Sequence, residues 1–354
     1  MSAAPARILS EVPDSTLEWL LAEDNPAVAV LARHALLGET HDGGEAAALW
    51  AHRNSYAPVA AILDAERSDG TWDTPSRDYQ KYRGSLWQVH FLGELWADSA
   101  DERVQWAAEY AFSRQMPDGA WSCNNKPAAE IPCLTANVAR ALARLGWARD
   151  ERIVRALEYM VDVHRRFGPV SCSEWRSNYT LNGYCHMLAP KLLLFLAEVP
   201  RELWPDGAED VRDAAVCALR DKQVFRCLPN GSREFMESVF TARRDEVAET
   251  REAWLAEHPI TTYGEKPGWL RFGFPLSYNS DALEALDALL GVGEPMREEY
   301  QAAVDLVRSK ADPLMRWKLA NSFNGKMHAD VETKGQPSRW LTLRALRVLE
   351  WAAG

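Results

Sequence analysis

The stretch that decides the fold runs Gln115-Met-Pro-Asp-Gly-Ala-Trp121-Ser-Cys-Asn-Asn-Lys-Pro-Ala-Ala-Glu-Ile-Pro-Cys133-Leu-Thr-Ala-Asn-Val-Ala-Arg-Ala-Leu-Ala-Arg-Leu-Gly-Trp147. A turn at Asp118-Gly119 leads through Trp121 into a short polar loop that ends at Cys133. The Ala- and Leu-rich segment that follows is apolar on most faces, which predicts a buried helix. Turn, aromatic residue and buried helix together form a unit that other parts of the chain repeat.

Further copies of the apolar segment are spread along the chain. The segment from Asn25 to Gly38 has a good N-cap residue, Pro26 at its first helical position and a glycine after its last turn. The second segment follows Asp69-Gly-Thr-Trp72, a near copy of the turn before Trp121. Six inner helices are predicted in all, beginning near Asn25, Ser85, Cys133, Cys185, Tyr278 and Ser338.

Charged, amphipathic segments alternate with the apolar ones. They cover residues 15–23, 43–65, 101–115, 150–165, 206–224 and 296–310. Six apolar helices wrapped by six amphipathic ones predict an all-α fold, an (α/α)6 toroid formed by one domain over residues 1–354 with almost no strand. An insertion around 228–275, with a charged helix near 232–257, is expected to cover one mouth of the ring.

Composition limits the function classes. The formal charge of −11 argues against a nucleic acid or an anionic membrane as the main partner. No apolar run reaches the roughly 18 residues of a membrane span, and the N-terminal residues lack the apolar core of a signal peptide, so a cytoplasmic protein is expected. The chain has 15 tryptophans, which suit the cores between repeats or the lining of an aromatic cavity.

The cysteines form a pattern of their own. Gly119-Ala-Trp-Ser-Cys123 returns as Gly168-Pro-Val-Ser-Cys172, and Cys133 before its helix returns as Cys185-His186. Two thiolates and one imidazole, from Cys133, Cys185 and His186, would leave one position of Zn²⁺ open, as in catalytic sites. A closed site made by Cys123, Cys133, Cys172 and Cys185 is the alternative set of ligands, and buried structural cysteines are the plainer interpretation.

Other candidate residues lie at the remaining starts of inner helices. His90 and Tyr278 could move a proton, as could Asp281, which could equally be a helix-start acid. Arg339 could bind a phosphate or carboxylate, or be a surface arginine. In a ring of helices all these starts meet at one end of the central cavity.

Gln115-x-x-Asp118-Gly119-x-Trp121 resembles the glutamine–tryptophan repeat motif of squalene–hopene cyclases and of the prenyltransferase β-subunit superfamily, and Asp69-Gly-Thr-Trp72 is a partial second copy. In that superfamily the Gln and Trp tie repeats together, so the motif indicates fold more than activity. The resemblance implies an isoprenoid or other large apolar substrate in a central aromatic cavity, and the tryptophan count fits this. A small apolar or peptide substrate is therefore the expected partner. The Asp-x-Asp-Asp acid motif of the class II terpene cyclases does not occur here.

The cysteine pattern resembles a third group with the same architecture. Lanthionine synthetase cyclases hold zinc with one Cys before an inner helix and a Cys-His pair before the next, as Cys133 and Cys185-His186 stand here, although their glycine signatures are missing. The leading hypothesis is a zinc enzyme that cyclises or transfers an isoprenoid-type substrate. The alternatives are a lanthionine-cyclase-like addition of a thiol to an activated alkene, and a non-catalytic toroid that binds a lipid or peptide.

Overall fold

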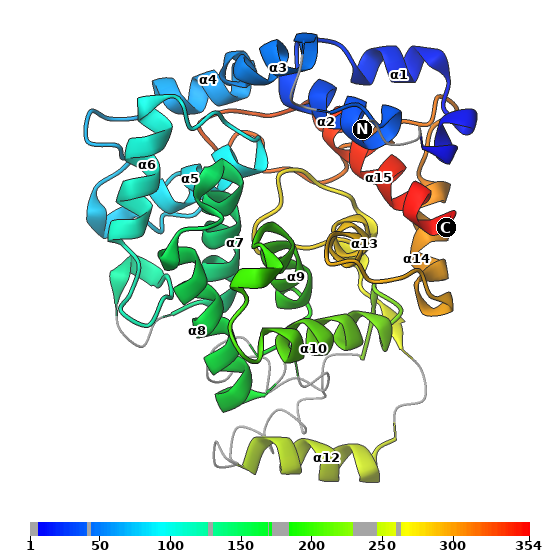
Figure 1. Cartoon of the computed structure of the whole chain (residues 1–354). Helices are drawn as coiled ribbons and strands as arrows, with labels where there is room; N and C mark the ends of the chain where they lie inside the picture. The colour runs from blue at the N-terminus through cyan, green and yellow to red at the C-terminus, as the bar shows by residue number, and fades with distance from the viewer. Residues whose placement is uncertain are drawn as a thin grey trace.

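The computed structural model describes residues 6–40, 44–126, 130–168, 170–171, 184–228, 246–259 and 263–354, and helices predominate in them. Figure 1 shows helices around most of the molecule, and the first described residues reach the C-terminal end, where Arg7 Nη1 donates to the Ala353 carbonyl oxygen at 3.3 Å. Six helices match the predicted inner helices: α2 (Pro26–Leu37), α5 (Ser85–Glu94), α7 (Pro132–Leu142), α9 (Leu188–Glu198), α13 (Ala282–Gly291) and α15 (Arg339–Ala352). The all-α prediction is confirmed for the described residues.

Local sequence signals place several of these helix ends. Asn25 caps α2 by accepting a hydrogen bond from the Val28 N–H, and Gly38 ends the helix in the left-handed conformation. Ser338 caps α15 in the same way. Two predicted starts were early, because α9 begins three residues after Cys185 and α13 begins four after Tyr278.

The amphipathic segments form the helices that lie outside these six. They are α1 (Asp14–Leu20), α3 (Gly44–Ala51), α4 (Ala57–Asp64), α6 (Glu102–Ser113), α8 (Glu151–Phe167), α10 (Ala208–Arg220) and α14 (Gln301–Ser309). The segment predicted as one helix over 43–65 is two helices, α3 and α4, separated by a 3-10 turn at Arg53–Ser55. The alternation of apolar and amphipathic helices is therefore observed, with one outer helix broken.

The inner helices contact one another in a fixed succession. Helix α5 packs on α7, α7 on α9, α9 on α13, α13 on α15 and α15 on α2. The N-terminal segment ties together α2 and α15, the last two members of this series, since Ala6 donates its N–H to the Leu36 carbonyl and Ile8 donates its N–H to the Glu350 carboxylate on α15. One continuous hydrophobic core runs through them from Ile8 to Leu349. Complete closure into a six-plus-six ring stays a prediction.

Tryptophan indoles tie each outer helix to the loop that follows it. Trp72, Trp121 and Trp317 each donate Nε1–H to the carbonyl oxygen ten residues earlier, on α4, α6 and α14, at 2.7, 2.8 and 2.7 Å. The backbone N–H of each tryptophan also donates to a hydroxyl on the next inner helix, that of Ser85, Thr135 and Thr342 respectively. We call this pair of bonds the indole contact, and it links outer helix, loop and inner helix in one repeat.

The contact at Trp317 was not predicted from the sequence. A residue two positions before each tryptophan has a positive φ, which glycine adopts readily at Gly70 and Gly119. Before Trp317 this residue is Met315, with φ 55°. The Gly-x-Trp signature is therefore absent from a repeat that has the same hydrogen bonds.

Gln115 adds a further link between repeats. Its side-chain amide donates to the carbonyl oxygens of Gly119, at 2.9 Å, and of Arg152 in the first turn of α8, at 2.8 Å. Gln115 thus links the end of the outer helix α6 to the outer helix α8, and Trp121 links α6 to the inner helix α7, which is the structural role that the repeat motif implies.

Strands are minor in the described part of the chain. Strand β1 (Arg226–Cys227) pairs antiparallel with β2 (Gly264–Glu265), and β3 (Trp317–Lys318) pairs antiparallel with β4 (Pro337–Ser338). The helix predicted near 232–257 corresponds to α12 (Val247–Glu257), beyond α10 at the lower edge of Figure 1; residues 229–245 and 260–262 lie outside the described residues. The prediction that the insertion covers a mouth of the ring stays a prediction.

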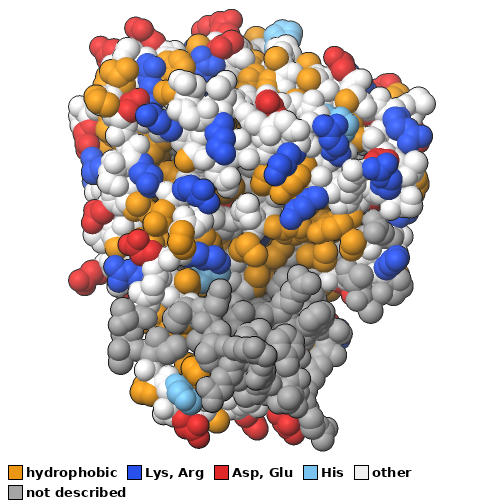
Figure 2. Space-filling model, turned by 180° about the vertical axis from the view of Figure 1, so that it is seen from behind, with side chains coloured by type: hydrophobic (Ala, Val, Ile, Leu, Met, Phe, Trp, Pro, Cys, Tyr) orange, Lys and Arg blue, Asp and Glu red, His pale blue; other side chains and the backbone are white. Residues whose placement is uncertain are grey.

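Two surface properties bear on partners. In the described ranges no helix has both the length and the apolar character needed to cross a membrane. The face shown in Figure 2 carries Lys and Arg side chains over much of its area and a band of hydrophobic side chains across it. Positive charge therefore gathers locally on a chain whose formal charge is −11.

Candidate active site

Four separate segments bring aromatic rings together at the start of α5. Trp87 has ring-centroid distances of 5.2 Å to Tyr278, 5.3 Å to Tyr82 and 6.2 Å to Tyr79. Tyr82 in turn stacks on Phe323 at 4.4 Å. Edge and offset arrangements of this kind are favourable for aromatic rings. We call Tyr79, Tyr82, Trp87, Tyr278 and Phe323 the aromatic cluster.

Two lysines lie over the cluster. Lys81 Nζ is 5.5 Å from the ring centroid of Tyr278 and 5.7 Å from that of Tyr82, and Lys326 Nζ is 5.8 Å from Tyr82. Both lysines are exposed. The cluster therefore has an apolar, electron-rich body and a cationic rim.

The loop that carries Tyr79, Lys81 and Tyr82 is attached to α6 through Asp78. Asp78 is 1% exposed, accepts a hydrogen bond from Tyr110 and pairs with Arg114 Nε at 2.6 Å, both on or next to α6. Burial raises the pKa of Asp78, although Tyr110 and Arg114 oppose this. Buried polar groups that are paired in this way fix the position of the backbone around them.

His90 lies one turn after Trp87 on α5 and is 3% exposed. Its Nε2 is 2.7 Å from the Leu276 carbonyl oxygen, which can only accept, so Nε2 carries the proton and Nδ1 the lone pair. Burial lowers the pKa of His90, with Glu94 opposing the shift. The imidazole is therefore a neutral base that is held in one tautomer.

Two buried polar atoms at this place have no hydrogen-bond partner among the described residues. They are Nδ1 of His90, an acceptor, and Nε1 of Trp87, a donor, and the two rings are 6.5 Å apart. Buried polar atoms in proteins are nearly always paired, and the exceptions are often at functional sites. A ligand hydroxyl or a water molecule is the kind of group that satisfies both.

Tyr278, predicted as a proton-transfer residue, lies in the aromatic cluster beside Trp87. Asp281, the other candidate on this segment, serves as a helix cap. Its Oδ1 accepts from the Glu284 N–H and its Oδ2 from the Gly273 N–H, both at 2.8 Å. Burial and then the Glu284 charge raise the pKa of Asp281 to about 7. Because each carboxylate oxygen accepts a backbone N–H, Asp281 holds the loop between Gly273 and α13 in place.

Arg339 is engaged elsewhere. Its Nη1 pairs with Asp24 at 2.8 Å, its Nε donates to the Trp19 carbonyl oxygen and its guanidinium lies 5.3 Å from the Trp19 ring centroid. These contacts attach the start of α15 to the end of α1. The structure therefore places Arg339 in a structural ion pair, and Lys81 and Lys326 are the cations beside the aromatic cluster.

The predicted metal ligands do not occupy matching positions. Cys133 is the second residue of α7 and is buried, whereas Cys185 precedes α9 and lies two residues before its N-cap, Met187. The Cys185 N–H donates to the Val170 carbonyl as the Ile131 N–H does to that of Trp121, so Cys185 corresponds to Ile131. The expectation that Cys133 and Cys185 are equivalent is wrong, because the two loops differ in length.

His186 is buried between aromatic rings, 4.9 Å from Trp269 and 5.4 Å from Tyr184. Burial and then the charge of Lys266 lower its pKa to about 4, so that the ring is neutral. Lys266 also interacts with Cys185. A neutral imidazole suits a metal ligand, but the neighbouring ammonium opposes a divalent cation.

Within the described ranges, no three or more His, Cys, Asp and Glu side chains form a group that could hold a metal ion. Cys123 begins a 3-10 turn, Cys123–Asn125, and Cys172 lies outside the described residues. Among the described predicted ligands, Cys123, Cys133, Cys185 and His186 do not come together in such a group. The zinc hypothesis stays a prediction from the sequence, and no step proposed below uses a metal.

Sequence reasoning missed a network of buried ion pairs across the inner helices. Arg140 on α7 pairs with Glu94 on α5, and Arg144 lies 3.7 Å from Glu94 and 2.5 Å from Glu198 on α9. On the other side, Arg344 on α15 is 3.8 Å from Glu94. The remaining pairs are Arg344–Asp287, Arg347–Asp287 and Lys191–Glu284, the last at 2.5 Å with both side chains 1% exposed.

The network keeps charged side chains in the interior of the protein. Burial by itself raises the pKa of Glu94, but Arg140, Arg144 and other cations outweigh it and bring the pKa to about 2. The carboxylate is thus charged in the interior. The second halves of α5, α7 and α9 are joined by charges, so the aromatic region is confined to the starts of the inner helices. Single charged residues inside otherwise apolar helices, such as Arg140 and Lys191, are the sequence signal that indicates such pairs.

Comparisons with known proteins add little. No protein-family model matches the sequence, and a comparison with curated proteins finds no significant match. One solved structure, the crystal structure of a protein from Actinoplanes, is similar over 84% of this chain and 98% of that chain, with 17% sequence identity and a TM-score of 0.32. A similarity this weak supports no inference about fold or function.

Proposed function

We propose that the chain is an enzyme of the terpene cyclase and prenyltransferase kind, an (α/α)6 toroid that transforms an apolar, isoprenoid-type substrate on the aromatic cluster. The succession of inner-helix contacts and the three indole contacts support the toroid. The observation that carries the chemistry is the pair of unsatisfied buried atoms, His90 Nδ1 and Trp87 Nε1, next to four further aromatic rings.

Each part of the cluster has a distinct task in this proposal. The ring faces of Trp87, Tyr82 and Tyr278 stabilise positive charge that develops on the substrate and keep water away from it. Lys81 and Lys326 attract an anionic group at the substrate's end. The buried core of the cluster takes the hydrocarbon part.

His90 ends the reaction by removing a proton. In an allylic diphosphate substrate the C–O bond to the diphosphate breaks first, its electron pair leaves with the diphosphate beside Lys81 and Lys326, and an allylic cation remains. A C–H bond next to the cationic carbon then breaks, its electron pair forms a C=C bond, and the proton goes to Nδ1 of His90. Glu94, one turn further along α5, stabilises the imidazolium that results. A neutral base with its lone pair fixed in direction suits this step, since the hydrogen bond to Leu276 holds the ring.

The test uses farnesol and farnesyl diphosphate as probes of the intact protein. Both should quench tryptophan fluorescence, and Trp87→Ala should weaken binding by about tenfold, in line with the loss of one buried aromatic contact. Trp106→Ala is the matched control, since Trp106 is 50% exposed on α6. Tyr82→Ala, at a partly exposed position, gives a second variant in case Trp87→Ala does not fold.

Turnover separates an enzyme from a protein that only binds. His90→Gln should keep the affinity for farnesol and lose the cyclised or transferred product that the unaltered chain forms from farnesyl diphosphate, followed by mass spectrometry. Tight binding without product in the unaltered chain would favour the non-catalytic toroid. Equal binding by the Trp87→Ala, Tyr82→Ala and unaltered proteins would remove the aromatic cluster as the site.

Elemental analysis decides the zinc hypothesis, and with it the lanthionine-cyclase-like alternative. That hypothesis expects about one zinc ion per chain, the stoichiometry of a single site, lost in Cys133→Ala and in Cys185→Ala. If protein purified without chelators contains no zinc, the zinc hypothesis is excluded. The proposal for the aromatic cluster stands in either case.

A further inference from the structure

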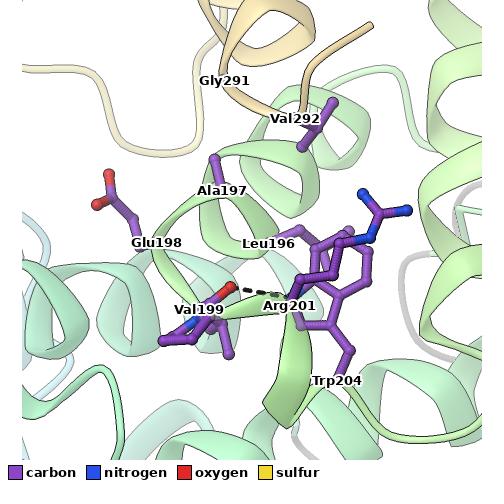
Figure 3. A pocket seen from close by; sticks show the side chains of 9 residues that line it. Leu196, Ala197, Glu198, Val199, Arg201, Trp204, Gly291 and Val292 are labelled. Carbon is purple, nitrogen blue, oxygen red and sulfur yellow. Dashed lines mark hydrogen bonds between the residues drawn. The ribbon is translucent and has the colours of Figure 1, made fainter.

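A concave site, separate from the aromatic cluster, lies where two inner helices end. Helices α9 and α13 finish side by side and border a pocket of about 410 Å³ with the connection that follows α9 (Figure 3). The aromatic cluster lies at the opposite end of the inner helices, near the start of α5 and before α13. The lining residues are Leu196, Ala197, Glu198, Val199, Pro200, Arg201, Trp204, Gly291 and Val292.

Close helix packing shapes the pocket. A Cβ atom at Gly291 would lie 3.1 Å from Cβ of Ala197, so the glycine lets α13 approach α9. Leu196, Val199 and Val292 add apolar side chains to the wall. The volume is in the range of about 300–1,000 Å³ that small-molecule sites have.

The electrostatics of this place favour a positive charge. The last carbonyl groups of a helix lack partners within the helix and carry a partial negative charge. Here α9 ends at Glu198 and α13 at Gly291, so two helix C-termini border one pocket. An anion would be repelled by both.

A side chain of the protein already places a cation here. The Arg201 guanidinium lies over the Trp204 ring, 4.8 Å from its centroid, as Figure 3 shows. Trp204 is fixed by a hydrogen bond from its Nε1 to the Val199 carbonyl oxygen, at 3.0 Å. Arg201 Nη2 also pairs with Glu209 at 2.5 Å, but their side chains are 61% and 51% exposed, and an exposed pair is easily displaced.

We propose that the pocket binds a small organic cation, an ammonium group with an apolar body, which replaces the Arg201 guanidinium on Trp204. The ligand's charge lies over the indole ring, close to Glu209 and to the two helix ends, and its apolar part packs on Leu196, Val199 and Val292. Displaced Arg201 moves into solvent. This site is independent of the function proposed for the aromatic cluster.

Benzyltrimethylammonium is a suitable probe, titrated into the full chain and followed by saturation-transfer NMR. The unaltered protein should bind it, and Arg201→Ala should bind it several-fold more tightly because the competing guanidinium is gone. Arg201→Lys, which keeps a cation on the ring, should behave like the unaltered protein. Trp204→Ala should weaken binding by about tenfold, as expected for a cation–π contact, while Trp106→Ala should change nothing.

The surface variants keep the experiment decisive if Trp204→Ala fails to fold. Arg201 and Glu209 are both exposed, so Arg201→Ala and Glu209→Gln leave the core intact, and Glu209→Gln should weaken binding. The proposal fails if neither the unaltered protein nor Arg201→Ala binds the probe. It also fails if Arg201→Ala binds more weakly, or if the neutral analogue neopentylbenzene or the anion phenylacetate binds as tightly.

Discussion

Glu94 on α5 and Arg140 on α7 form an ion pair in which both side chains are 2% exposed. Two further cations, on Arg144 and Arg344, lie within 3.8 Å of the same carboxylate. Three inner helices that are far apart in sequence thus meet at one buried charge. Removing one partner from such a group leaves the other charges buried without compensation.

Glu94→Gln should therefore destabilise the fold by about 3–5 kcal/mol, measured by urea unfolding at neutral pH. The matched control is Glu11→Gln, which breaks the exposed Arg308–Glu11 pair and should change stability by no more than about 1 kcal/mol. Because the folded pKa of Glu94 is depressed to about 2, its stabilising effect is present above its unfolded pKa and is lost as pH falls through the folded pKa. Equal effects of the two variants would show that the network contributes no more than surface charges do.

Glu332 should make stability depend on pH in the sense opposite to Glu94. Its Oε1 accepts the Arg339 N–H at the start of α15. Burial raises the pKa of this carboxyl to about 7, against hydrogen bonds from Ser338 and from the backbone. A raised folded pKa means that the stabilising contribution is complete below the unfolded pKa, about 4.3, and is lost as pH rises through about 7.

Glu332→Gln should remove this dependence, because an amide keeps the acceptor and does not titrate. Relative to the variant, the unaltered protein should lose on the order of 2–3 kcal/mol between pH 5 and pH 8. Urea unfolding of both proteins across this pH range gives the difference directly, and other titrating groups cancel in it. Parallel pH profiles of the two proteins would contradict the raised pKa.

Trp317→Phe tests the indole contact that lacks its glycine signature. The change removes the Nε1–H bond to the Val307 carbonyl oxygen, which keeps only the Lys310 N–H at 3.1 Å, and it opens a small void, so a loss of about 1–3 kcal/mol is expected. Thermal and urea unfolding measure it. Trp106→Phe on the exposed face of α6 should stay within about 0.5 kcal/mol, and a similar small effect at Trp317 would mean that the bond does not hold the repeat together.

Local signals in the sequence were enough for most helices. The cap at Asn25 and the alternation of apolar and amphipathic segments predicted most of the helices that the structure shows, because capping and amphipathicity act over a few neighbouring residues. The predicted equivalence of Cys133 and Cys185 was wrong because it depended on the length of a loop. Local signals do not fix the length of the loop between Trp121 and α7, or of the corresponding loop between Val170 and α9, and the two loops differ in length.

The candidate site was predictable only in part. His90 lies within α5 and Tyr278 lies four residues before α13, and both are beside Trp87. Lys81 and Lys326 come from loops whose course depends on distant anchors, such as the bond from Tyr110 to Asp78, so no short pattern reveals them. The partners of Arg140 are on other helices, which is why the charge could be read from the sequence and the ion pair could not.

Gly119→Ala separates steric collision from backbone strain in the turn that begins the repeat. Gly119 has φ 94°, and a Cβ atom there would lie 2.2 Å from the Arg155 carbonyl oxygen on α8. Gly335 has φ 86°, and a Cβ atom there would meet nothing within 4 Å among the described residues, so Gly335→Ala carries the strain alone, about 1–2 kcal/mol. In urea unfolding, Gly119→Ala should lose about 2 kcal/mol or more of stability beyond the loss in Gly335→Ala. The added Cβ atom forces α8 away from the turn, and this movement also disturbs the hydrogen bond from Gln115 to the Arg152 carbonyl oxygen. If both variants lose the same stability, the contact between the turn and α8 is loose, and the glycine is required only for its positive φ.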